Sequence, residues 1–434
     1  MLKMLILYYF RIKLFIKMLK YDVIVIGGGA AGMMAAGHAA ELGCKVLILE
    51  KMQYPGRKLG ITGKGRCNIT NTSPLAEFIQ KIKPDGNFLN PAFSIFFSDE
   101  LIKFMNNIGI KTAVERGNRV FPENENAVEV AKKMIFWCKR KSVRIKTGQK
   151  VDSLIIKDKN VVGVSVNENG IKTTYYSDKV ILASGGASYP RTGSTGDGYQ
   201  IAKSVGHTIN DISPSLVPIE GAGSIASRLD GLELKNINAT VFVDDKKVAE
   251  DFGEMLFRDS AITGPVILTL SRIIVPELKQ KKKVEVFIDL KSALGEIKLE
   301  NRLLREFEKQ KNENYRTILN KLLPMKLIPI CISQTRISKY RLGSEINTEE
   351  RKRLLTWLKN FRIRIIGHRD FDEAIITAGG IDTNEIDPDT MASKFVKGLY
   401  FAGEIIDVDG PTGGYNLQIA FSTAWLAAEA VSIK

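Results

Sequence analysis

Three glycines near the beginning of the chain have the spacing of a turn that binds phosphate groups. Gly27, Gly29 and Gly32 form a Gly-x-Gly-x-x-Gly motif directly after the apolar, β-branched run Asp22–Ile26. In such a motif the first glycine permits a tight turn, the second lets the backbone approach a pyrophosphate, and the third lets the next helix pack closely on the strand. The amino end of that helix supplies free N–H groups and partial positive charge. The motif therefore predicts a site for an anionic dinucleotide.

An acidic residue stands where the adenosine ribose of such a dinucleotide would lie. The apolar run Lys45–Leu49 predicts a second parallel strand, which ends at Glu50, 18 residues after Gly32. A carboxylate there accepts hydrogen bonds from the ribose hydroxyls and repels a 2′-phosphate, which disfavours NADP. A glycine turn without a ligand would not require strand, helix and acid in this order. Together these features indicate a dinucleotide site, but they do not distinguish FAD from NAD.

The segment 51–71, directly after the ribose acid, is rich in glycine and in basic residues. Its glycines permit backbone N–H contacts, and its basic side chains have the charge to meet phosphate groups. These basic residues include Arg57, Lys58, Lys64 and Arg66. A basic surface loop is the alternative interpretation. The position of the segment favours a role in the cofactor site.

Short predicted strands separated by turn residues fill the region 143–183. They lie at 143–147, 151–158, 160–167, 171–177 and 179–183, and we interpret them as an antiparallel meander inserted into a parallel sheet. The last strand leads into a glycine-rich turn that begins at Ser184. This order is expected of an FAD domain like that of the glutathione-reductase class, rather than of a plain NAD dehydrogenase.

The carboxyl-terminal segment has the features of a flavin contact. The predicted buried strand Leu399–Ala402 is followed by Gly403 and Glu404, where flavoproteins of this kind usually have a Gly-Asp pair that contacts the ribityl chain. Gly413 and Gly414 then precede a helix rich in small residues. The amino end of that helix would face the N1/C2 carbonyl edge of the flavin, and its dipole would stabilise negative charge there by about 0.3–2 kcal/mol. FAD is therefore the predicted cofactor.

A second Gly-x-Gly-x-x-Gly motif with its own strand and acid is missing from the sequence. A pyridine nucleotide therefore has no predicted Rossmann site of its own. If NAD(P)H is the reductant, we expect it to bind transiently and in another way.

The overall composition is that of a globular protein with two or three domains, because the chain has 434 residues of which 44% are hydrophobic. Its 63 Lys and Arg exceed its 48 Asp and Glu, which gives a net charge of +15. Such a charge fits nucleic acid, a membrane surface or an anionic cofactor. Because the basic residues are dispersed, we predict that they cover solvated faces. The predicted partner is a small-molecule substrate, with no nucleic acid.

The four cysteines form no Cys-x-x-Cys pair and only three histidines are present, so neither a metal site nor a disulfide framework is predicted. This cysteine usage favours the reducing cytoplasm. The apolar segment 1–18 is interrupted by four basic residues and is too short to span a bilayer, so no membrane span is predicted. It is either an amphipathic surface anchor or an extension upstream of a natural start at Met18, and we favour the second.

From Tyr21 onward the chain resembles the BaiN/YhiN-like family of flavoproteins, also called aminoacetone-oxidase-like FAD-binding enzymes. The motifs that carry the resemblance are GGGAAG (27–32), GRKLGITGKGRCNITN (56–71), ASGGASYPRTGSTGDGY (183–199), ITGP (262–265), EIDPDTMASK (385–394) and GLYFAGEIIDVDGPTGGYNLQIAFSTAW (398–425). The second and the last are specific to the family, whereas many flavoproteins share the first.

The resemblance implies an α/β fold in which a split Rossmann-type FAD-binding domain carries an inserted β-barrel-like subdomain and a small helical subdomain. On this basis the FAD domain occupies 19–207 and 371–434. The barrel-like domain occupies 208–295 and returns at 347–370, and the helical domain occupies 296–346. Basic amphipathic helices are predicted at 297–335 and 347–359, and a short helix at Gly264–Arg272.

Two motifs depart from the family pattern. The family has Leu-Phe-Thr-His before the Gly-Pro of ITGP, where this chain has Arg258 and Asp259 in the last two positions. The family has Met-Glu-Ser-Lys in the late motif, where this chain has Ala392 in place of the acid. Only cofactor residues are therefore carried over, and no substrate residues.

The sequence leaves several functions open. The first is an FAD-dependent oxidoreductase that transfers two electrons between the flavin and a small organic substrate, either by oxidising an amine with O₂ or by reducing a C=C bond with NAD(P)H. The alternatives are an FAD-dependent tRNA-modifying protein and a non-catalytic flavin-binding protein. Cys67 is interpreted as a packed residue rather than a redox thiol, since no other cysteine is nearby in sequence.

No catalytic residue and no metal ligand is assigned from the sequence, and the oligomeric state is left open. Tyr189, Arg191, Tyr415 and Asn416 lie in motifs that flank the flavin, each with a structural role as the alternative. The predicted cofactor-binding residues are Gly27, Gly29, Ala30, Ala31, Gly32, Glu50, Lys51, Arg57, Lys58, Gly65, Arg66, Cys67, Asn68, Val151, Ser184, Gly185, Gly186, Gly403, Glu404, Gly413, Gly414, Tyr415 and Asn416.

Overall fold

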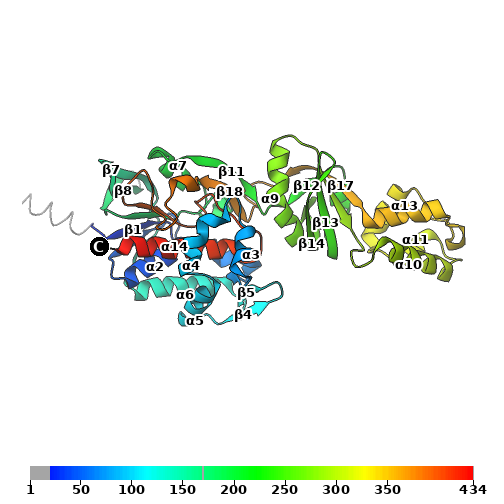
Figure 1. Cartoon of the computed structure of the whole chain (residues 1–434), viewed down its shortest axis with the longest axis horizontal. Helices are drawn as coiled ribbons and strands as arrows, with labels where there is room; N and C mark the ends of the chain where they lie inside the picture. The colour runs from blue at the N-terminus through cyan, green and yellow to red at the C-terminus, as the bar shows by residue number, and fades with distance from the viewer. Residues whose placement is uncertain (1–19, 169–170, 434) are drawn as a thin grey trace, which may run out of the picture. The chain divides into compact units, whose positions relative to one another are not determined.

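A computed structural model describes residues 20–168 and 171–433 of the chain. The two interpretations of residues 1–18 lie outside these described residues. The chain divides into two compact units, one formed by the chain up to Ser213 together with the part from Ile375 onward, and the other by Pro214–Ala374. Figure 1 labels the helices and strands of each unit.

A five-stranded parallel sheet forms the centre of the first unit, in the order β19-β10-β1-β2-β6. Its strands are β1 (Val23–Ile26), β2 (Val46–Leu49), β6 (Arg144–Lys146), β10 (Val180–Leu182) and β19 (Leu399–Phe401). Every residue of β1 and β2 is buried, as the uninterrupted apolar runs of the sequence predict for a parallel sheet covered on both faces. The Rossmann-type fold class predicted from the sequence is confirmed.

Two helices with small side chains pack against each other beside this sheet. These are α2 (Ala30–Glu41), which follows the glycine turn, and α14 (Tyr415–Ser432), shown in red in Figure 1. The His38 ring stacks on Trp425 with ring centroids 3.5 Å apart, and His38 Nε2 lies 2.8 Å from Glu429 Oε1. Alanines and glycines along both helices allow this close packing, so that α14 fixes the position of α2.

The meander predicted between residues 143 and 183 has three strands rather than five. The antiparallel sheet contains β7 (Val151–Lys157), β8 (Asn160–Glu168) and β9 (Ile171–Tyr176). The predicted first and last strands are β6 and β10, which both pair in the parallel sheet. The physical reason is that α6 (Ala127–Arg140) precedes β6 and provides the crossover that a parallel pairing with β2 requires.

The first unit also contains two small sheets, one of β3 (Thr70–Asn71), β5 (Arg119–Pro122) and β4 (Thr112–Glu115), the other of β11 (Ile209–Ser215) and β18 (Ile376–Ile381). Among the described residues, the remaining α-helices of this unit are α3 (Leu75–Gln80), α4 (Asn90–Ile95), α5 (Ser98–Asn107) and α7 (Asp197–Ser204).

The second unit is built on a closed barrel with the strand order β12-β15-β14-β13-β16-β17. Its strands are β12 (Ile219–Gly221), β13 (Glu233–Val243), β14 (Lys246–Arg258), β15 (Ala261–Thr263), β16 (Val284–Asp289) and β17 (Phe361–His368). Alternate residues of β13 are buried, as expected for strands with one face inside a barrel. The barrel carries α8 (Ile225–Arg228) and α9 (Pro265–Lys279), which is longer than predicted because buried Ile274 and Val275 continue its apolar face.

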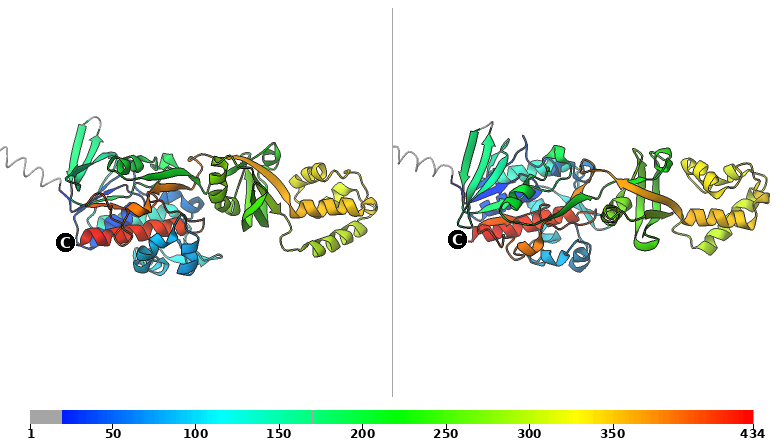
Figure 2. Two further views of the ribbon diagram at one scale, coloured as in Figure 1. Left: turned by 45° about the horizontal axis from the view of Figure 1, so that its top comes forward. Right: turned by 90° about the horizontal axis from the view of Figure 1, so that it is seen from above.

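A group of helices is inserted between β16 and β17 of the barrel. It contains α10 (Glu296–Lys309), α11 (Tyr315–Leu319), α12 (Ile328–Thr335) and α13 (Thr348–Lys359), and Figure 2 shows α10 and α13 side by side. Asn347 caps α13 by accepting a 2.9 Å hydrogen bond from the Glu350 N–H group. No helix in the described part of the chain is long and apolar enough to cross a membrane.

Candidate functional site

The candidate site lies at the carboxyl edge of the parallel sheet. Strands β19, β10 and β1 are neighbours and all run in the same direction, so the turns that follow them meet at one edge. These turns begin at Gly27 after β1, at Ala183 after β10 and at Ala402 after β19. The three glycine-rich motifs of the sequence are therefore brought together, although the last lies more than 370 residues beyond the first.

The Gly27–Gly32 turn has no room for side chains at two of its glycines. Gly27 adopts a φ of +100°, and a Cβ atom there would lie 2.5 Å from the Ala183 carbonyl oxygen. A Cβ atom on Gly32 would lie 1.9 Å from the Gly27 carbonyl oxygen, so only glycine lets α2 begin this close to β1. Gly29 differs, because a Cβ atom there would meet no protein atom within 4 Å. The space beside Gly29 is open to a ligand.

The Glu50 carboxylate is held by two backbone donors at the end of β2. It accepts a 2.7 Å hydrogen bond from the Gly28 N–H group and another of 2.7 Å from the Met52 N–H group. The side chain is buried beside the glycine turn. Since an ionised carboxylate has about four acceptor positions, two remain for ribose hydroxyls. The structure thus places the predicted ribose acid next to the predicted phosphate turn.

Gly403 brings the end of β19 to the beginning of α2. A Cβ atom on Gly403, which has a φ of +79°, would lie 2.8 Å from the Ala31 Cβ atom. The Gly403 N–H group donates a 3.0 Å hydrogen bond to Thr423 Oγ1 of α14. The first turn of α2, with Ala30 and Ala31, thereby lies between the glycine turn and Gly403.

Glu404 is the centre of a polar cluster that joins four segments of the first unit. Its carboxylate accepts hydrogen bonds from Lys58 Nζ at 2.8 Å, from Ser188 Oγ at 3.0 Å and from the Thr377 N–H group at 2.9 Å. The Gly186 N–H group lies 3.4 Å from the same carboxylate. Only about a fifth of the Lys58 and Glu404 side chains is exposed, at 22% and 21%. The predicted ribityl-contacting acid is thus already oriented by protein donors.

The amino end of α14 is positioned by the end of the segment 51–71. Gly414 has a φ of +99°, and a Cβ atom there would lie 2.2 Å from the Thr70 carbonyl oxygen. The Asn68 side-chain amide nitrogen faces the Thr70 carbonyl oxygen, and its oxygen accepts a 3.2 Å hydrogen bond from the Gly414 N–H group. Asn71 Nδ2 donates to the Gly413 carbonyl oxygen at 3.0 Å. The family-specific segment therefore holds the glycines that precede α14.

The predicted phosphate-binding cations are placed differently from one another. Lys51 forms a 2.6 Å ion pair with Asp197, and Arg66 forms ion pairs with Glu115 and with Glu125. These ion pairs, like that of Lys58 with Glu404, neutralise positive charges that were predicted to contact phosphate groups. Arg57 is exposed, as is Gly65. The carboxylate partners lie in other segments of the chain, so the sequence of the segment 51–71 alone does not predict these ion pairs.

Three other predicted cofactor-binding residues have side chains that form hydrogen bonds or pack within the protein. Asn416 accepts from the Gly410 N–H group at 2.9 Å and donates to the Gly410 carbonyl oxygen at 2.8 Å. The Tyr415 ring packs against Phe78 with ring centroids 4.3 Å apart and is only 3% exposed. Val151 is buried at the beginning of β7. Contacts of these residues with a cofactor remain predictions.

Cys67 is enclosed by protein, which supports its interpretation as a packed residue. Its side chain has no exposed surface, and burial raises the pKa of the thiol to about 12. The residue has a φ of +60°. A contact between Cys67 and a cofactor would therefore have to use the backbone.

We expect Cys67 to resist alkylation in the folded protein, because a neutral, enclosed thiol is a poor nucleophile. Iodoacetamide at pH 8 should modify the half-buried Cys44 and leave Cys67 unmodified, as measured by peptide mass spectrometry. Because the pKa of Cys67 is raised on folding, its contribution to stability should be lost as the pH rises from about 8.5 towards 12. Rapid labelling of Cys67 at pH 8 would contradict this prediction.

Sequence reasoning missed two residues of the Glu404 cluster, Ser188 and Thr377. Ser188 lies within a recognised glycine-rich motif but had no assigned role. Thr377 lies on β18, and its Oγ1 atom also accepts a 2.8 Å hydrogen bond from the Ala187 N–H group. No local pattern marks Thr377, since its partners Ala187 and Glu404 lie 190 residues before it and 27 residues after it.

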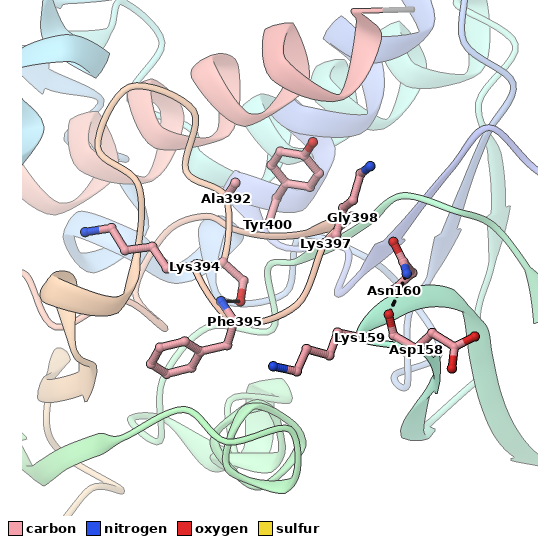
Figure 3. A pocket seen from close by; sticks show the side chains of 10 residues that line it. Asp158, Lys159, Asn160, Ala392, Lys394, Phe395, Lys397, Gly398 and Tyr400 are labelled. Carbon is pink, nitrogen blue, oxygen red and sulfur yellow. Dashed lines mark hydrogen bonds between the residues drawn. The ribbon is translucent and has the colours of Figure 1, made fainter.

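A separate pocket of about 470 Å³ lies at the opposite edge of the sheet (Figure 3). It is lined by Lys159 and Asn160 of the meander, by Phe395 and by Gly398, which precedes β19. Because Gly403 follows β19, this pocket and the glycine turns lie at opposite ends of that strand. The pocket is therefore separate from the candidate cofactor site.

The residues at the glycine turns fit a dinucleotide such as FAD. Gly29 leaves open space at the amino end of α2, and Gly403 joins the beginning of α2 to Thr423 in the middle of α14. The hydroxyl oxygen of Ser184, after β10, is buried and has no hydrogen-bond partner among the described residues. The open space beside Gly29 is what a bound pyrophosphate would fill.

Comparison with known proteins identifies full-length relatives. The HI0933-like protein Rossmann domain family matches residues 21–430. The chain is 31% identical over 410 residues to a 3-dehydro-bile acid delta(4,6)-reductase of Clostridium scindens, covering 94% of this chain and 98% of the relative. It is 30% identical to a ribosomal RNA dihydrouridine synthase of Haemophilus influenzae and 28% identical to that of Escherichia coli, each again over 94% and 98% of the two chains.

A solved structure supports the fold. The 3-ketosteroid delta1-dehydrogenase of Sterolibacterium denitrificans superposes with a TM-score of 0.50 at 13% identity, covering 95% of this chain and 99% of that chain. At this identity the similarity concerns the fold alone. It agrees with the Rossmann-type parallel sheet of the first unit.

Proposed function

The chain belongs to the HI0933-like Rossmann-domain family of FAD-binding oxidoreductases, and from this membership we propose that it reduces a C=C bond conjugated to a carbonyl group. The observation that carries the proposal is the meeting of the Gly27–Gly32 turn and Gly403 at one sheet edge, with Gly403 against Ala420 and Thr423 of α14. The chain aligns over this whole arrangement with relatives whose names describe such reductions. A 3-keto compound with delta(4,6) unsaturation and a uridine both contain a conjugated C=C bond.

In this proposal FAD, when bound, supplies the two electrons as a hydride equivalent. The protein residues hold and orient the cofactor. The first turn of α2 would bind the pyrophosphate through backbone N–H groups, and Glu50 would bind the adenosine ribose. Glu404 and its donors would fix the turn beside the ribityl chain. The amino end of α14 would favour negative charge on the flavin ring, by up to about 2 kcal/mol in a partly buried setting.

NAD(P)H is the proposed electron donor, bound transiently as expected from the absence of a second Rossmann motif in the sequence. Amine oxidation with O₂ is the less favoured direction, since the named full-length relatives are a reductase and two dihydrouridine synthases. The first proposed substrate class is a small conjugated enone. No proton donor is assigned.

The uracil base of an RNA is the second proposed substrate. Two relatives with this kind of substrate in their names align over 94% of the chain. The net charge of +15 is compatible with an RNA substrate, and residues 314–344 contain six Lys and Arg and no Asp or Glu. This proposal narrows the RNA-modifying alternative of the sequence analysis.

The test is an anaerobic titration of the purified protein, followed through its visible flavin absorbance. We expect NADH or NADPH to bleach the band, and a 3-keto-4,6-diene steroid or uridine-containing RNA to restore it with formation of the saturated product. Bleaching by aminoacetone, with peroxide formed in air, would instead indicate an amine oxidase. Bound FAD that no donor reduces would indicate a non-catalytic flavoprotein, and protein that cannot be loaded with FAD would contradict the proposal.

A further inference from the structure

A short turn in the helical part of the second unit carries exposed cations and an exposed aromatic residue. Residues 336–341 (Arg-Ile-Ser-Lys-Tyr-Arg), here called the basic turn, connect α12 to the segment before α13. Arg336, Lys339 and Tyr340 are exposed, and Tyr340 is exposed to 74% of its surface. Ile337 is the exception, with 1% exposed. The turn therefore presents its charged and aromatic side chains to solvent and buries its aliphatic one.

The basic turn is anchored rather than loosely attached. The Tyr315 N–H group donates a 2.7 Å hydrogen bond to the Arg341 carbonyl oxygen, and the Arg341 N–H group donates to the Ser338 carbonyl oxygen at 3.0 Å. The Tyr315 side chain has no exposed surface, and it lies within the helices with its hydroxyl group 3.4 Å from Thr335 Oγ1. A surface fixed in this way loses little conformational entropy when it binds a partner.

Two further basic residues extend the surface of the basic turn. The Arg316 N–H group donates to the Lys339 carbonyl oxygen at 3.3 Å, which places the exposed Arg316 beside Lys339. The exposed Arg353 of α13 donates through Nε to the Thr335 carbonyl oxygen at 3.0 Å, next to Arg336. One patch thus combines residues from three separate segments.

The positive charge of this patch is only partly neutralised. Within the described part of the chain, Arg316, Arg336 and Lys339 form no ion pair, whereas Arg341 lies 3.5 Å from a Glu350 carboxylate oxygen. The nearest acids in sequence, Glu313 and Glu345, lie outside the stretch 314–344. Unpaired arginines and lysines on a fixed turn are suited to several phosphate groups at once.

Tyr340 distinguishes the patch from a simple cationic face. Lys339 Nζ lies 4.8 Å from the centre of the Tyr340 ring, and the ring is flanked in sequence by Lys339 and Arg341. Exposed aromatic rings between basic residues stack on nucleic-acid bases while the cations contact the backbone. An anionic lipid surface would favour exposed aliphatic side chains, and the basic turn buries its Ile337.

We propose that the basic turn, with Arg316 and Arg353, is an RNA-binding surface. It contacts the phosphate backbone through its cations and stacks Tyr340 on an unpaired base. This inference rests on the second proposed substrate, and it assigns RNA recognition to a part of the chain without any of the cofactor motifs. The sequence prediction that nucleic acid is not a partner is the alternative that the experiment decides.

The test compares two variants of the FAD-loaded, full-length protein with equal changes in charge. The turn variant is R316Q/R336Q/K339Q. The control variant is R228Q/K246Q/K281Q, which neutralises three exposed cations in the barrel part of the second unit. Binding of a fluorescein-labelled, uridine-containing RNA hairpin is measured by fluorescence anisotropy at several KCl concentrations. We expect the turn variant to bind the hairpin at least about tenfold more weakly than the unmodified protein. We also expect the salt slope, which is the slope of the logarithm of the binding constant against the logarithm of the KCl concentration, to fall in magnitude by about 2–3, and the control variant to be unchanged.

A second variant, Y340A, separates stacking from charge. We expect it to weaken binding by about tenfold while leaving the salt slope unchanged, because it removes a base contact and no cation. The inference is overturned if the turn variant and the control bind the hairpin equally, or if the turn variant loses affinity only for phosphatidylglycerol vesicles. Reduction of a steroid enone without hairpin binding would refute this inference alone. Hairpin binding without any flavin turnover would refute the proposed reaction alone.

Discussion

Replacing Gly29 by valine is expected to reduce FAD affinity by about 100-fold while the protein folds normally. A Cβ atom on Gly29 would meet no protein atom within 4 Å, and its φ of −78° suits any residue, so nothing in the protein opposes the substitution. The same side chain would occupy the space that a pyrophosphate needs next to the backbone. A 100-fold loss corresponds to about 2.7 kcal/mol, within the range of steric penalties in packed sites.

The measurement is FAD binding to the stripped protein by fluorescence quenching, together with the thermal unfolding midpoint of each apoprotein. Gly295→Val is the matched control, because Gly295 also has free space around its Cα atom and lies in the other unit. Gly32→Ala should behave differently from both, since its Cβ atom would lie 1.9 Å from the Gly27 carbonyl oxygen and would disturb the fold itself. Unchanged FAD affinity in Gly29→Val would refute the assigned pyrophosphate position.

Removing the Glu404 carboxylate is expected to lower the free energy of unfolding by about 2–4 kcal/mol. Glu404→Leu would leave the Lys58 ammonium group, the Ser188 hydroxyl group and the Thr377 N–H group without their acceptor in a largely buried place. Breaking one side of a buried ion pair typically costs about 3–5 kcal/mol, and the one-fifth exposure of this pair reduces the figure. Against a typical total of about 5–15 kcal/mol, this is a large loss.

A double-mutant cycle distinguishes this pairing from general packing. The double variant Lys58→Met with Glu404→Leu should recover part of the loss, because neither charge is then left alone. The exposed pair Lys20–Asp178 is the control, and Asp178→Asn should change the free energy of unfolding by less than about 1 kcal/mol. Urea denaturation followed by circular dichroism measures all variants. Strict additivity of the two single changes would contradict the predicted coupling.

The sequence alone determined the features that depend on neighbours along the chain. The β-branched run, the three glycines, the helix of small residues and the acid Glu50 predicted the phosphate turn. The structure agrees, because backbone conformation and close approach at Gly27 and Gly32 are local requirements. The glycines before α14 and the buried strand β19 were found in the same way. The inserted barrel and helical domains were expected from the family resemblance, and the sequence itself also predicted amphipathic helices at 297–335 and 347–359.

Only the tertiary structure decided which charged residues are partners, because ion pairs join residues that are far apart in the chain. Arg66 is a predicted phosphate ligand, and the structure pairs it with Glu115 and Glu125, which lie 49 and 59 residues away. Lys58 and Glu404 form an ion pair although they are 346 residues apart in the chain. The Thr377 N–H group donates to the same carboxylate, and no sequence motif predicted that contact. The predicted strand 143–147 was assigned to the wrong sheet, since hydrogen-bond partners of a strand are not encoded in its own periodicity. Dispersed cations in the sequence became one patch around the basic turn, because folding sets Arg316 and Arg353 beside it.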